Sequence, residues 1–590
     1  MRTPRLHRVA FPLLALVIGL PTPSRGADRL RSFDLCPNGR VRLVAGKNLK
    51  FNNLEKIFIC GDPKEKAWEH IPLSQAKFHL GTFLQSRGYF TPVFSEEGDG
   101  LVVYPGTRSR VSGFRAENAP PELKPKQRRL VRGRVLTPKF LDHMENWARS
   151  RLQARGYPCA RVESRANIDS GEVVLEVDAG EKQVLGSIEV EPIDKMESGV
   201  LRRFDAFRFG KTYNNDWLAL SERRIEENGL LQSSYFTPNC DKPPGPEGFS
   251  VTQHTFAGKP RLLHFGFGAD TEEYVIVKGD WTHTRMTPKA WRFNVNVYAS
   301  YKRQELNVSQ AFYFFKPESR LHFLPLAKFE HRRETQYHYL SGDVQAAMAT
   351  SWDWQNVGLE LTAGPDLNYT DTFRGAQPGL TRFLTLEYDA KLTSHGFEFW
   401  QTSPRTGFYV RLQGGFGSSD LLSEISAQRF ELDWQYLYTV KGWDPPLFIL
   451  GLRGGFYGTF MDRNAENLAK LPPNYRYYLG GSSNLRGFER EELPGPDGAL
   501  SAAFTSFELR VANWIPYGIQ PLAFVDVGVL GDQAFRFDAP IYYSPGFGLR
   551  YESPVGVFRT TFAWGMKSSE ADANPDNTHF QFFFGFGEEF

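Results

Sequence analysis

The sequence predicts a membrane β-barrel of sixteen antiparallel strands that follows three small α+β repeats. The first half of the chain repeats a helix followed by two short strands, and the second half consists of alternating, strand-length segments that end in turn signals. Beyond the N-terminus, no apolar run reaches the roughly 18 residues that a spanning helix needs. With 590 residues, the chain is too long for one domain.

The composition argues against two classes of function. The formal net charge is only +3 at pH 7, and the basic residues are scattered rather than interleaved with aromatic residues, so we predict no nucleic-acid partner. The GxSxG, HExxH, Walker and dinucleotide motifs do not occur in a credible context. We therefore predict that the protein is not an enzyme and has no catalytic residue and no cofactor.

The first 26 residues are typical of a secretory signal peptide. Three arginines among the first eight residues precede the apolar segment Val9–Leu20, and small residues follow in 21–27. The alternative is an uncleaved signal anchor, which the short core and its interruption by Pro12 disfavour. We expect cleavage near Gly26 or Ala27 and an exported mature protein.

The chain has four cysteines, Cys36, Cys60, Cys159 and Cys240. An even number of cysteines in an exported protein permits disulfides. Cys36 and Cys60 form the predicted local pair, whereas a bond between Cys159 and Cys240 would join two repeats and is not decided by the sequence. Their spacing does not resemble a zinc site, so we predict no metal.

The repeats are marked by a recurring phrase. LQSRGY at 84–89 returns as LQARGY at 152–157, and a more divergent third copy contains RRIEENG at 223–229. Two alternating segments around a turn follow each copy, which predicts a hairpin. The predicted hairpins are Thr91–Ser95 with Leu101–Pro105, Ala160–Ser164 with Val173–Val177, and Ser234–Thr237 with Ser250–Phe256.

Apolar residues three and four positions apart predict a helix before the glycine of each phrase, and the glycine then takes the left-handed position that ends it. The helical apolar residues are Phe140, Leu141, Met144, Trp147, Ala148 and Leu152 in the second repeat, and Trp217, Leu218, Leu220 and Ile225 in the third. Each repeat is also predicted to open with a strand. These strands are Ile57–Cys60, then Val131–Leu136 or Val111–Arg115, then Val184–Glu191.

The repeats define the domain boundaries. We predict a signal peptide at 1–26, repeats at 27–107, 108–184 and 185–261, and the barrel at 262–590. Small sheets leave edge strands open, and an open edge can accept an extended peptide as an added strand. The alternative is that the repeats are spacers with blunted edges.

From residue 262 onward the period of the apolar residues changes to two, which is typical of a membrane barrel. Only a closed barrel satisfies the backbone of strands in lipid. Short connections at 441–446, 516–518 and 553–554 alternate with long ones at 364–381, 459–499 and 568–578. The predicted strands are 262–269, 274–284, 290–301, 306–315, 320–331, 336–349, 354–364, 382–393, 405–415, 427–438, 446–457, 500–514, 518–530, 539–551, 555–565 and 577–587.

The most unusual segment is the glycine-rich stretch YYLGGSSNLRGFEREE at 477–492. Its glycines permit tight backbone paths, so we predict that the loop folds back on itself. Arg486 could then reach Asp526, a lone carboxylate on an otherwise apolar strand, and form a bidentate ion pair inside the barrel. The alternative is an exposed arginine without a role. The charged run at 489–492 is interpreted as the solvated flank of the loop.

The barrel must close between its first strand, Leu262–Ala269, and its last strand, Thr578–Gly587. Glycines on these strands give the seam poor side-chain packing. A seam that parts exposes unpaired N–H and C=O groups to which an incoming strand can pair. A permanently closed barrel is the alternative. The predicted seam residues are Leu262, Phe265, Gly266, Gly268, Phe582, Phe584, Gly585 and Phe590.

These features together resemble the BamA/TamA superfamily of POTRA-containing outer-membrane assembly factors. Its members carry a Val/Ile-Arg-Gly-Phe/Tyr motif on the sixth loop and a Phe-x-Asp-x-Gly motif on strand thirteen. LRGF at 485–488 and FVDVG at 524–528 are similar, with Leu485 as a mild departure. The motif residues to which the resemblance assigns the lumen ion pair and its surroundings are Arg486, Gly487, Phe488, Asp526 and Gly528.

Two further segments and the repeat number support the resemblance. The stretch at 544–556 resembles the penultimate hairpin of the superfamily, and the aromatic end at 580–590 is similar to the signal by which barrel proteins are recognised for insertion. Three repeats, two of which have a helix that ends in Leu-x-x-x-Gly-Tyr, resemble those of the translocation and assembly module subunit TamA.

The resemblance implies a factor that assembles or translocates β-barrel and autotransporter clients through a lateral seam. The implied partners are these outer-membrane or autotransported clients, an inner-membrane-anchored protein that spans the periplasm, and the lipid bilayer of the outer membrane. The repeats would lie in the periplasm, and the Arg486 loop would be the sixth extracellular loop. The alternatives are a two-partner-secretion exporter of one dedicated protein, a general assembly factor of the BamA type, a lipid-transport role and a passive porin.

Overall fold

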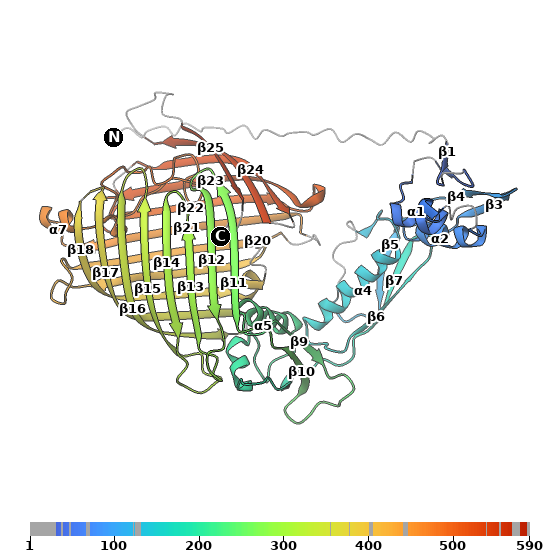
Figure 1. The fold of residues 1–590 in the computed structure, drawn as a ribbon, viewed down its shortest axis with the longest axis horizontal. Coiled ribbons are helices and arrows are strands. Elements are labelled where there is room, and N and C mark those ends of the chain that lie inside the picture. The colour runs from blue at the N-terminus through green and yellow to red at the C-terminus, as the bar shows by residue number, and fades with distance from the viewer. Residues whose placement is uncertain are drawn as a thin grey trace, which may run out of the picture. The chain divides into compact units, whose positions relative to one another are not determined.

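The computed structural model describes residues 31–586 except 37–38, 46–48, 66–70, 122, 124–130, 355, 377, 400–404, 441–445, 538–539, 554–555 and 569–578. The predicted signal peptide, the predicted seam residue Phe590 and most of two predicted connections, 441–446 and 568–578, lie outside the described part. Figure 1 shows a β-barrel and, earlier in the chain, three small sheets with helices. The predicted fold class is confirmed: a closed barrel of sixteen strands follows three α+β sheets.

The first repeat is a sheet in the order β1-β2-β4-β3 with two helices packed on it. β2 and β4 run parallel, and β3 pairs antiparallel with β4. The core contains Leu43, Leu80 and Leu84, all fully buried. The elements are β1 (Arg31–Asp34), β2 (Val41–Ala45), α1 (Asn53–Cys60), α2 (Leu73–Gln85), β3 (Val93–Glu97) and β4 (Gly100–Tyr104).

The opening strand predicted at Ile57–Cys60 is wrong, because these residues form the end of helix α1. A capping box begins this helix: the Glu55 amide donates to Asn52 Oδ1 at 2.8 Å, and the Asn52 amide donates to Glu55 Oε2 at 2.8 Å. These two bonds satisfy amides that a helix start otherwise leaves unpaired. The cap therefore outweighs the strand preference of the apolar residues that follow.

The second and third repeats share one three-stranded plan, β5-β7-β6 and β8-β10-β9. In the third, the central strand β10 runs parallel to β8 and antiparallel to β9. The edge strands β6 and β9 are the first strands of the predicted hairpins. The elements are β5 (Gly113–Glu117), α4 (Pro138–Gln153), β6 (Arg161–Ala166), β7 (Glu172–Asp178), β8 (Leu185–Val190), η3 (Ser198–Phe204), α5 (Asn215–Glu227), β9 (Ser233–Pro238) and β10 (Phe249–Phe256).

The glycine after the main helix of each repeat has the predicted left-handed backbone. Its φ is 88° at Gly88, 107° at Gly156 and 64° at Gly229. A side chain is strained in this conformation, which explains why the recurring phrase keeps glycine there. In the described part of the chain, no helix has both the length and the apolar character needed to span a membrane.

Both disulfides that the sequence permits are formed. Cys36 joins Cys60 within the first repeat, between the β1–β2 turn and the end of α1. Cys159, after α4, joins Cys240, in the β9–β10 connection, at a sequence separation of 81 residues. The second bond therefore links the second repeat to the third, a choice that the sequence left open.

The barrel strands pair in chain order, each antiparallel to the next, and the last returns to the first. All sixteen predicted strands exist, with ends that differ by several residues. They are β11 (Arg261–Asp270), β12 (Tyr274–His283), β13 (Arg292–Ala299), β14 (Arg303–Ala311), β15 (His322–Arg333), β16 (His338–Trp354), β17 (Val357–Arg374), β18 (Gly379–Ser394), β19 (Gly407–Gly417), β20 (Ala427–Thr439), β21 (Phe448–Met461), β22 (Ser501–Val511), β23 (Ile519–Gly531), β24 (Tyr542–Ser553), β25 (Gly556–Lys567) and β26 (His579–Phe586).

The long connection predicted at 364–381 is wrong, because β17 and β18 continue through most of it as a paired ladder. Polar residues of this segment, among them Asp366 and Asn368, are buried within β17. Polar side chains of a barrel strand can face the interior, so they do not mark the end of the strand. Near Gly364 the β16 backbone approaches so closely that an added Cβ would lie 2.2 Å from the Ala346 carbonyl oxygen.

The third repeat is bound to the short-turn end of the barrel by a cluster of charged residues. Arg224 on α5 donates through Nη2 to Asp353 Oδ1 at 3.0 Å and through Nε to Glu398 Oε1 at 2.6 Å. His395 Nε2 lies 2.7 Å from the same Asp353 oxygen. Glu398 and His395 belong to the short helix α6 (His395–Phe399), so two barrel turns hold one helix of the repeat.

Candidate functional site

The segment between β21 and β22 folds back as predicted. Its backbone pairs with itself at Tyr477 with Ala499 and at Leu479 with Leu493. Leu485 is fully buried and Phe488 nearly so, in one apolar cluster with residues of the barrel wall. This burial fixes the path of the loop and positions Arg486, which lies between these two apolar anchors.

Arg486 and Asp526 form a bidentate ion pair, and both side chains are 0 % exposed. Arg486 Nη2 donates to Asp526 Oδ1 at 2.7 Å, and Nε donates to Oδ2 at 2.9 Å. The Arg486 backbone amide also donates to Oδ2 at 3.1 Å. Two parallel N–H···O bonds fix the relative orientation of guanidinium and carboxylate, so the pair sets where the loop sits against β23.

Other residues complete the surroundings of the guanidinium. Arg486 Nη1 donates to Glu508 Oε2 at 2.8 Å, and Nη2 donates to Ser506 Oγ at 2.9 Å. Its Cζ lies 3.3 Å from the centroid of the Phe524 ring, a cation–π contact. Sequence analysis missed Glu508 and Ser506. The available signal was the alternation of Ser506, Glu508 and Arg510, which places three polar side chains on one face of β22.

The motif glycines permit close backbone contact. A Cβ on Gly487 would lie 2.3 Å from the Gly565 amide nitrogen, and one on Gly528 would lie 2.8 Å from a Leu485 methyl carbon. The Gly487 amide donates to Ser544 Oγ at 3.0 Å. Phe488 stacks edge-on against Tyr542 with ring centroids 5.5 Å apart. The loop therefore contacts β23, β24 and β25 as well as the ion pair.

The interpretation of the charged run at 489–492 as a solvated flank is wrong for its two central residues. Arg490 Nη1 donates to Glu273 Oε1 at 2.7 Å, and its Nε donates to Glu334 Oε1 at 3.0 Å. Glu491 accepts hydrogen bonds from Arg332 and from the Tyr337 hydroxyl. The partners lie in or beside the β11–β12 and β15–β16 connections, and no local pattern in the sequence reveals them.

The seam joins β11 to β26 and closes the barrel. In the described residues, β11 pairs with β26 only at Ala269 with Phe586 and Asp270 with Gly585, whereas it pairs with β12 over its full length. The Thr271 amide adds one hydrogen bond, to the Phe584 carbonyl oxygen at 3.0 Å.

The predicted seam residues fall into three groups. Phe584 and Gly585 belong to the paired part, and the backbone of Phe586 is so near Gly268 that an added Cβ would lie 3.0 Å from its carbonyl oxygen. Phe582 pairs with Phe562 of β25 rather than across the seam. Among the predicted seam residues, Leu262, Phe265 and Gly266 of β11 have no described contact with β26 in the strand pairing.

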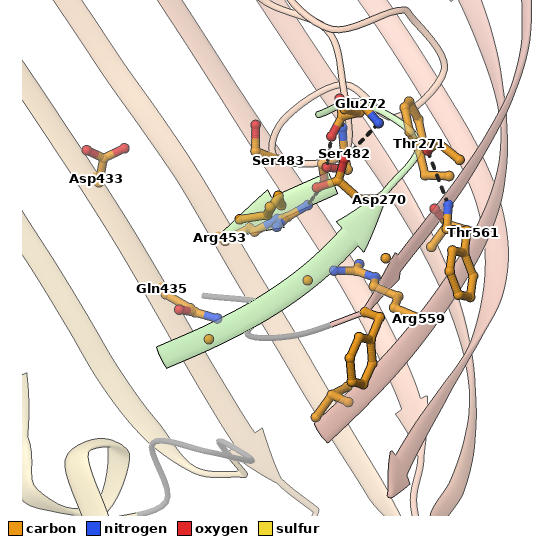
Figure 2. Close-up of a pocket in the computed structure, with 18 of the residues that line it drawn as sticks. Asp270, Thr271, Glu272, Asp433, Gln435, Arg453, Ser482, Ser483, Arg559 and Thr561 are labelled. Carbon is orange, nitrogen blue, oxygen red and sulfur yellow. Dashed lines mark hydrogen bonds between the residues drawn. The ribbon is translucent and has the colours of Figure 1, made fainter. Parts of the chain in front are cut away.

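A cavity of about 580 Å³ lies behind the seam (Figure 2). Its lining comes from β11, β12, β19, β20, β21, β22, β25 and β26, from the β11–β12 connection and from the loop at Ser482 and Ser483. The described residues contain no cluster of three or more His, Cys, Asp or Glu side chains that could hold a metal ion. The site therefore consists of a braced loop, the seam and a cavity between them that is lined by both apolar and charged side chains.

The comparison with protein families decides the identity of the chain. The model described as the Omp85 superfamily domain matches residues 282–590, more than half of the sequence. The chain belongs to the Omp85 superfamily. A membrane β-barrel of this superfamily indicates the bacterial outer membrane.

Two of the solved structures to which the chain is similar are a BamA and a CdiB. BamA from Haemophilus ducreyi lacking POTRA domains 1–3 is similar with a TM-score of 0.50 and 14% identity, over 82% of this chain and 99% of that chain. CdiB from Acinetobacter baumannii is similar with a TM-score of 0.43 and 12% identity, over 82% of this chain and 90% of that one. The likeness to BamA shows a shared fold.

Proposed function

We propose that this Omp85 protein is a TamA-like insertase or translocation factor that handles β-barrel and autotransporter clients through a seam that opens laterally. The observation that carries the proposal is the contrast between the seam and every other strand pair. β11 and β26 share two residue pairs in the described part of the chain, whereas neighbouring barrel strands share seven or more. Counted over the described residues, opening the barrel there breaks the fewest backbone hydrogen bonds.

An open seam provides a template for a client strand. Backbone groups of β11 at Arg261–Gly268 have no described partner on the side of β26. An extended client segment can pair there by strand addition and enter the bilayer sideways, where its own groups must stay paired. Phe265 and Phe267 are 68 % and 71 % exposed, so the outer surface of β11 suits contact with lipid.

The repeats support the same proposal. We place them in the periplasm, where the edge strands β6 and β9 can receive a client before it reaches the barrel. The end with the long loops then faces outward, and the Arg486 loop is the sixth extracellular loop. An inner-membrane-anchored protein that spans the periplasm is the proposed partner of the repeats.

The test uses the purified full chain in lipid vesicles. A urea-unfolded β-barrel client is added, and the inserted fraction is read from protease protection and heat-modifiable gel mobility. We expect at least a tenfold faster insertion than into empty vesicles. A soluble exoprotein offered in the same way should stay outside. Transport of the exoprotein without barrel insertion would favour a two-partner-secretion exporter, and a large steady conductance without either activity would favour a porin.

A further inference from the structure

One turn of the barrel makes contacts both across the seam and with the braced loop at 477–493. It is the connection between β11 and β12, residues 271–273. The Thr271 amide donates to the Phe584 carbonyl oxygen of β26 at 3.0 Å, and the Phe584 amide donates back to Thr271 Oγ1 at 3.3 Å. The turn is therefore part of the seam itself.

Glu272, the next residue of the turn, holds the braced loop at Ser482 (Figure 2). Its Oε1 accepts the Ser482 amide at 3.1 Å, and its Oε2 accepts the Ser482 hydroxyl. Gly481 has a φ of 102°, and a Cβ added there would clash with Glu272 Oε1. Glycine at this position therefore lets the loop backbone lie directly against the turn.

Glu273 is the second anchor, and it is buried. Arg490 Nη1 of the loop donates to Glu273 Oε1 at 2.7 Å, and the Tyr298 hydroxyl donates to Oε2 at 2.5 Å. Arg490 Nε also donates to Glu334 Oε1 at 3.0 Å. A buried carboxylate whose two oxygens are both bonded loses much more when its partner leaves than an exposed one does.

Asp270 joins the seam contact and the two anchors into one unit. Its Oδ1 accepts the Glu272 amide at 2.8 Å and also accepts the Glu273 amide, which fixes the shape of the turn. The same residue pairs with Gly585 of β26 in the seam. A displacement of the turn from β26 therefore displaces both anchors from the loop.

The braced loop also touches the other side of the seam. Phe488 packs against His579 of β26, with ring centroids 5.8 Å apart. The Gly487 backbone lies so near Gly565 of β25 that a side chain would not fit between them. The loop thus contacts β25 and β26 on one side of the seam and the β11–β12 turn on the other.

We infer that Glu272 and Glu273 are positioning residues that couple the seam to the braced loop, so that Thr271 leaves β26 only when the turn also leaves the loop. The inference rests on the proposed function, because the coupling has a role only in a barrel that opens. The alternative is that the two carboxylates stabilise their own turn and that the loop has no effect on the seam.

The test measures hydrogen exchange of residues 582–586 of β26 in the full chain in detergent micelles. The release variant combines Glu272→Ala, which removes the contact with Ser482, and Arg490→Gln, which removes the ion pair with Glu273. Neither change lies on β26, so intrinsic exchange there is unaltered. We expect exchange at 582–586 to become roughly tenfold faster, whereas the β19 and β20 amides should keep their protection.

Arg490→Gln alone decides between the coupling and its alternative, because it leaves every residue of the turn unchanged. We expect roughly threefold faster exchange at 582–586 in this variant. Arg490→Lys keeps a positive charge for Glu273 and should restore most of the protection. If the release variant does not fold, judged by gel mobility, these two single variants still decide: unchanged exchange in Arg490→Gln overturns the coupling.

The matched control is Asp389→Ala, which removes a barrel carboxylate that pairs with Arg411 rather than with the loop. Its exchange at 582–586 should equal that of the unmodified protein. Unchanged exchange at 582–586 in the release variant, or an equal acceleration on β19 and β20, contradicts the inference.

Vesicle insertion separates this inference from the proposed function. Normal client insertion by the unmodified protein, together with unchanged exchange in the release variant, would refute the coupling and leave the function intact. Faster exchange in the release variant, together with no insertion by the unmodified protein, would refute the function and leave the contact between loop and seam established.

Discussion

At the scale of residues, the ion pair of Arg486 is the link between a loop and the barrel wall. A buried guanidinium and carboxylate both lose water, and the loss is offset only if their geometry is good and their remaining polar atoms are bonded. Here Asp526 accepts three N–H bonds from Arg486, and the remaining donors of Arg486 bind Glu508 and Ser506. The loop can therefore be released only at the cost of several buried bonds.

Arg486→Ala and Asp526→Ala should each destabilise the barrel by about 3–5 kcal/mol, because each leaves a buried charge without its partner. The double variant should cost clearly less than the sum of the two. Urea unfolding in micelles, followed by gel mobility, measures both values.

The control for this cycle is Arg463→Ala, because its partner Asp532 is 81 % exposed at the side chain. An exposed ion pair contributes about 0–1 kcal/mol, so Arg463→Ala should change the free energy of unfolding very little. Additive and small effects at Arg486 and Asp526 would show that the pair does not brace the loop.

At the scale of elements, helix α5 of the third repeat contains a carboxyl group that titrates near neutral pH. Glu222 Oε1 accepts the Phe236 amide of β9 at 2.6 Å, and burial raises the pKa of Glu222 to about 7. The folded repeat thus favours the protonated form. Protonated Glu222 therefore stabilises the folded repeat. This stabilisation is complete below the pKa of about 4.3 that the group has in the unfolded chain, and it is lost as pH rises through about 7.

Hydrogen exchange of the full chain should therefore show less protection of the α5 and β9 amides at pH 8 than at pH 5, after correction for intrinsic exchange. The expected difference in opening free energy is on the order of 1–3 kcal/mol. Glu222→Gln stays neutral at every pH and should remove most of this dependence. Glu189→Gln, which removes an exposed glutamate bound to Lys242, is the control and should keep it. An unchanged dependence in Glu222→Gln would contradict the assignment.

The elements also show where sequence analysis succeeds. The barrel strands and the helices α4 and α5 follow from periods of two and 3.6, which are local properties of the chain. The helix at Asn53–Cys60 was misread because its cap at Asn52 was overlooked. In the candidate site, Arg486 and Asp526 stood out as isolated charges among glycine or apolar residues. Glu508 and Arg490 did not, because their roles depend on partners far away in sequence.

At the scale of the whole molecule, the barrel is closed, and its described strands pair over the fewest residues at one place. The third repeat is held to its short-turn end through Arg224, and the Arg486 loop is held to the opposite connections through Arg490. The seam between β11 and β26 has two residue pairs in the described part of the chain. The proposed function therefore depends on this seam as the place where a client enters.

The most direct measurement is client insertion into vesicles by a chain with cysteines at Ala269 and Phe586, which face each other across the seam. The control carries cysteines at Asn296 and Asn307, which face each other on β13 and β14. We predict that oxidation lowers insertion at least tenfold in the seam variant, that reduction restores it, and that the control is unaffected. Undiminished insertion with the seam cross-linked would contradict the account.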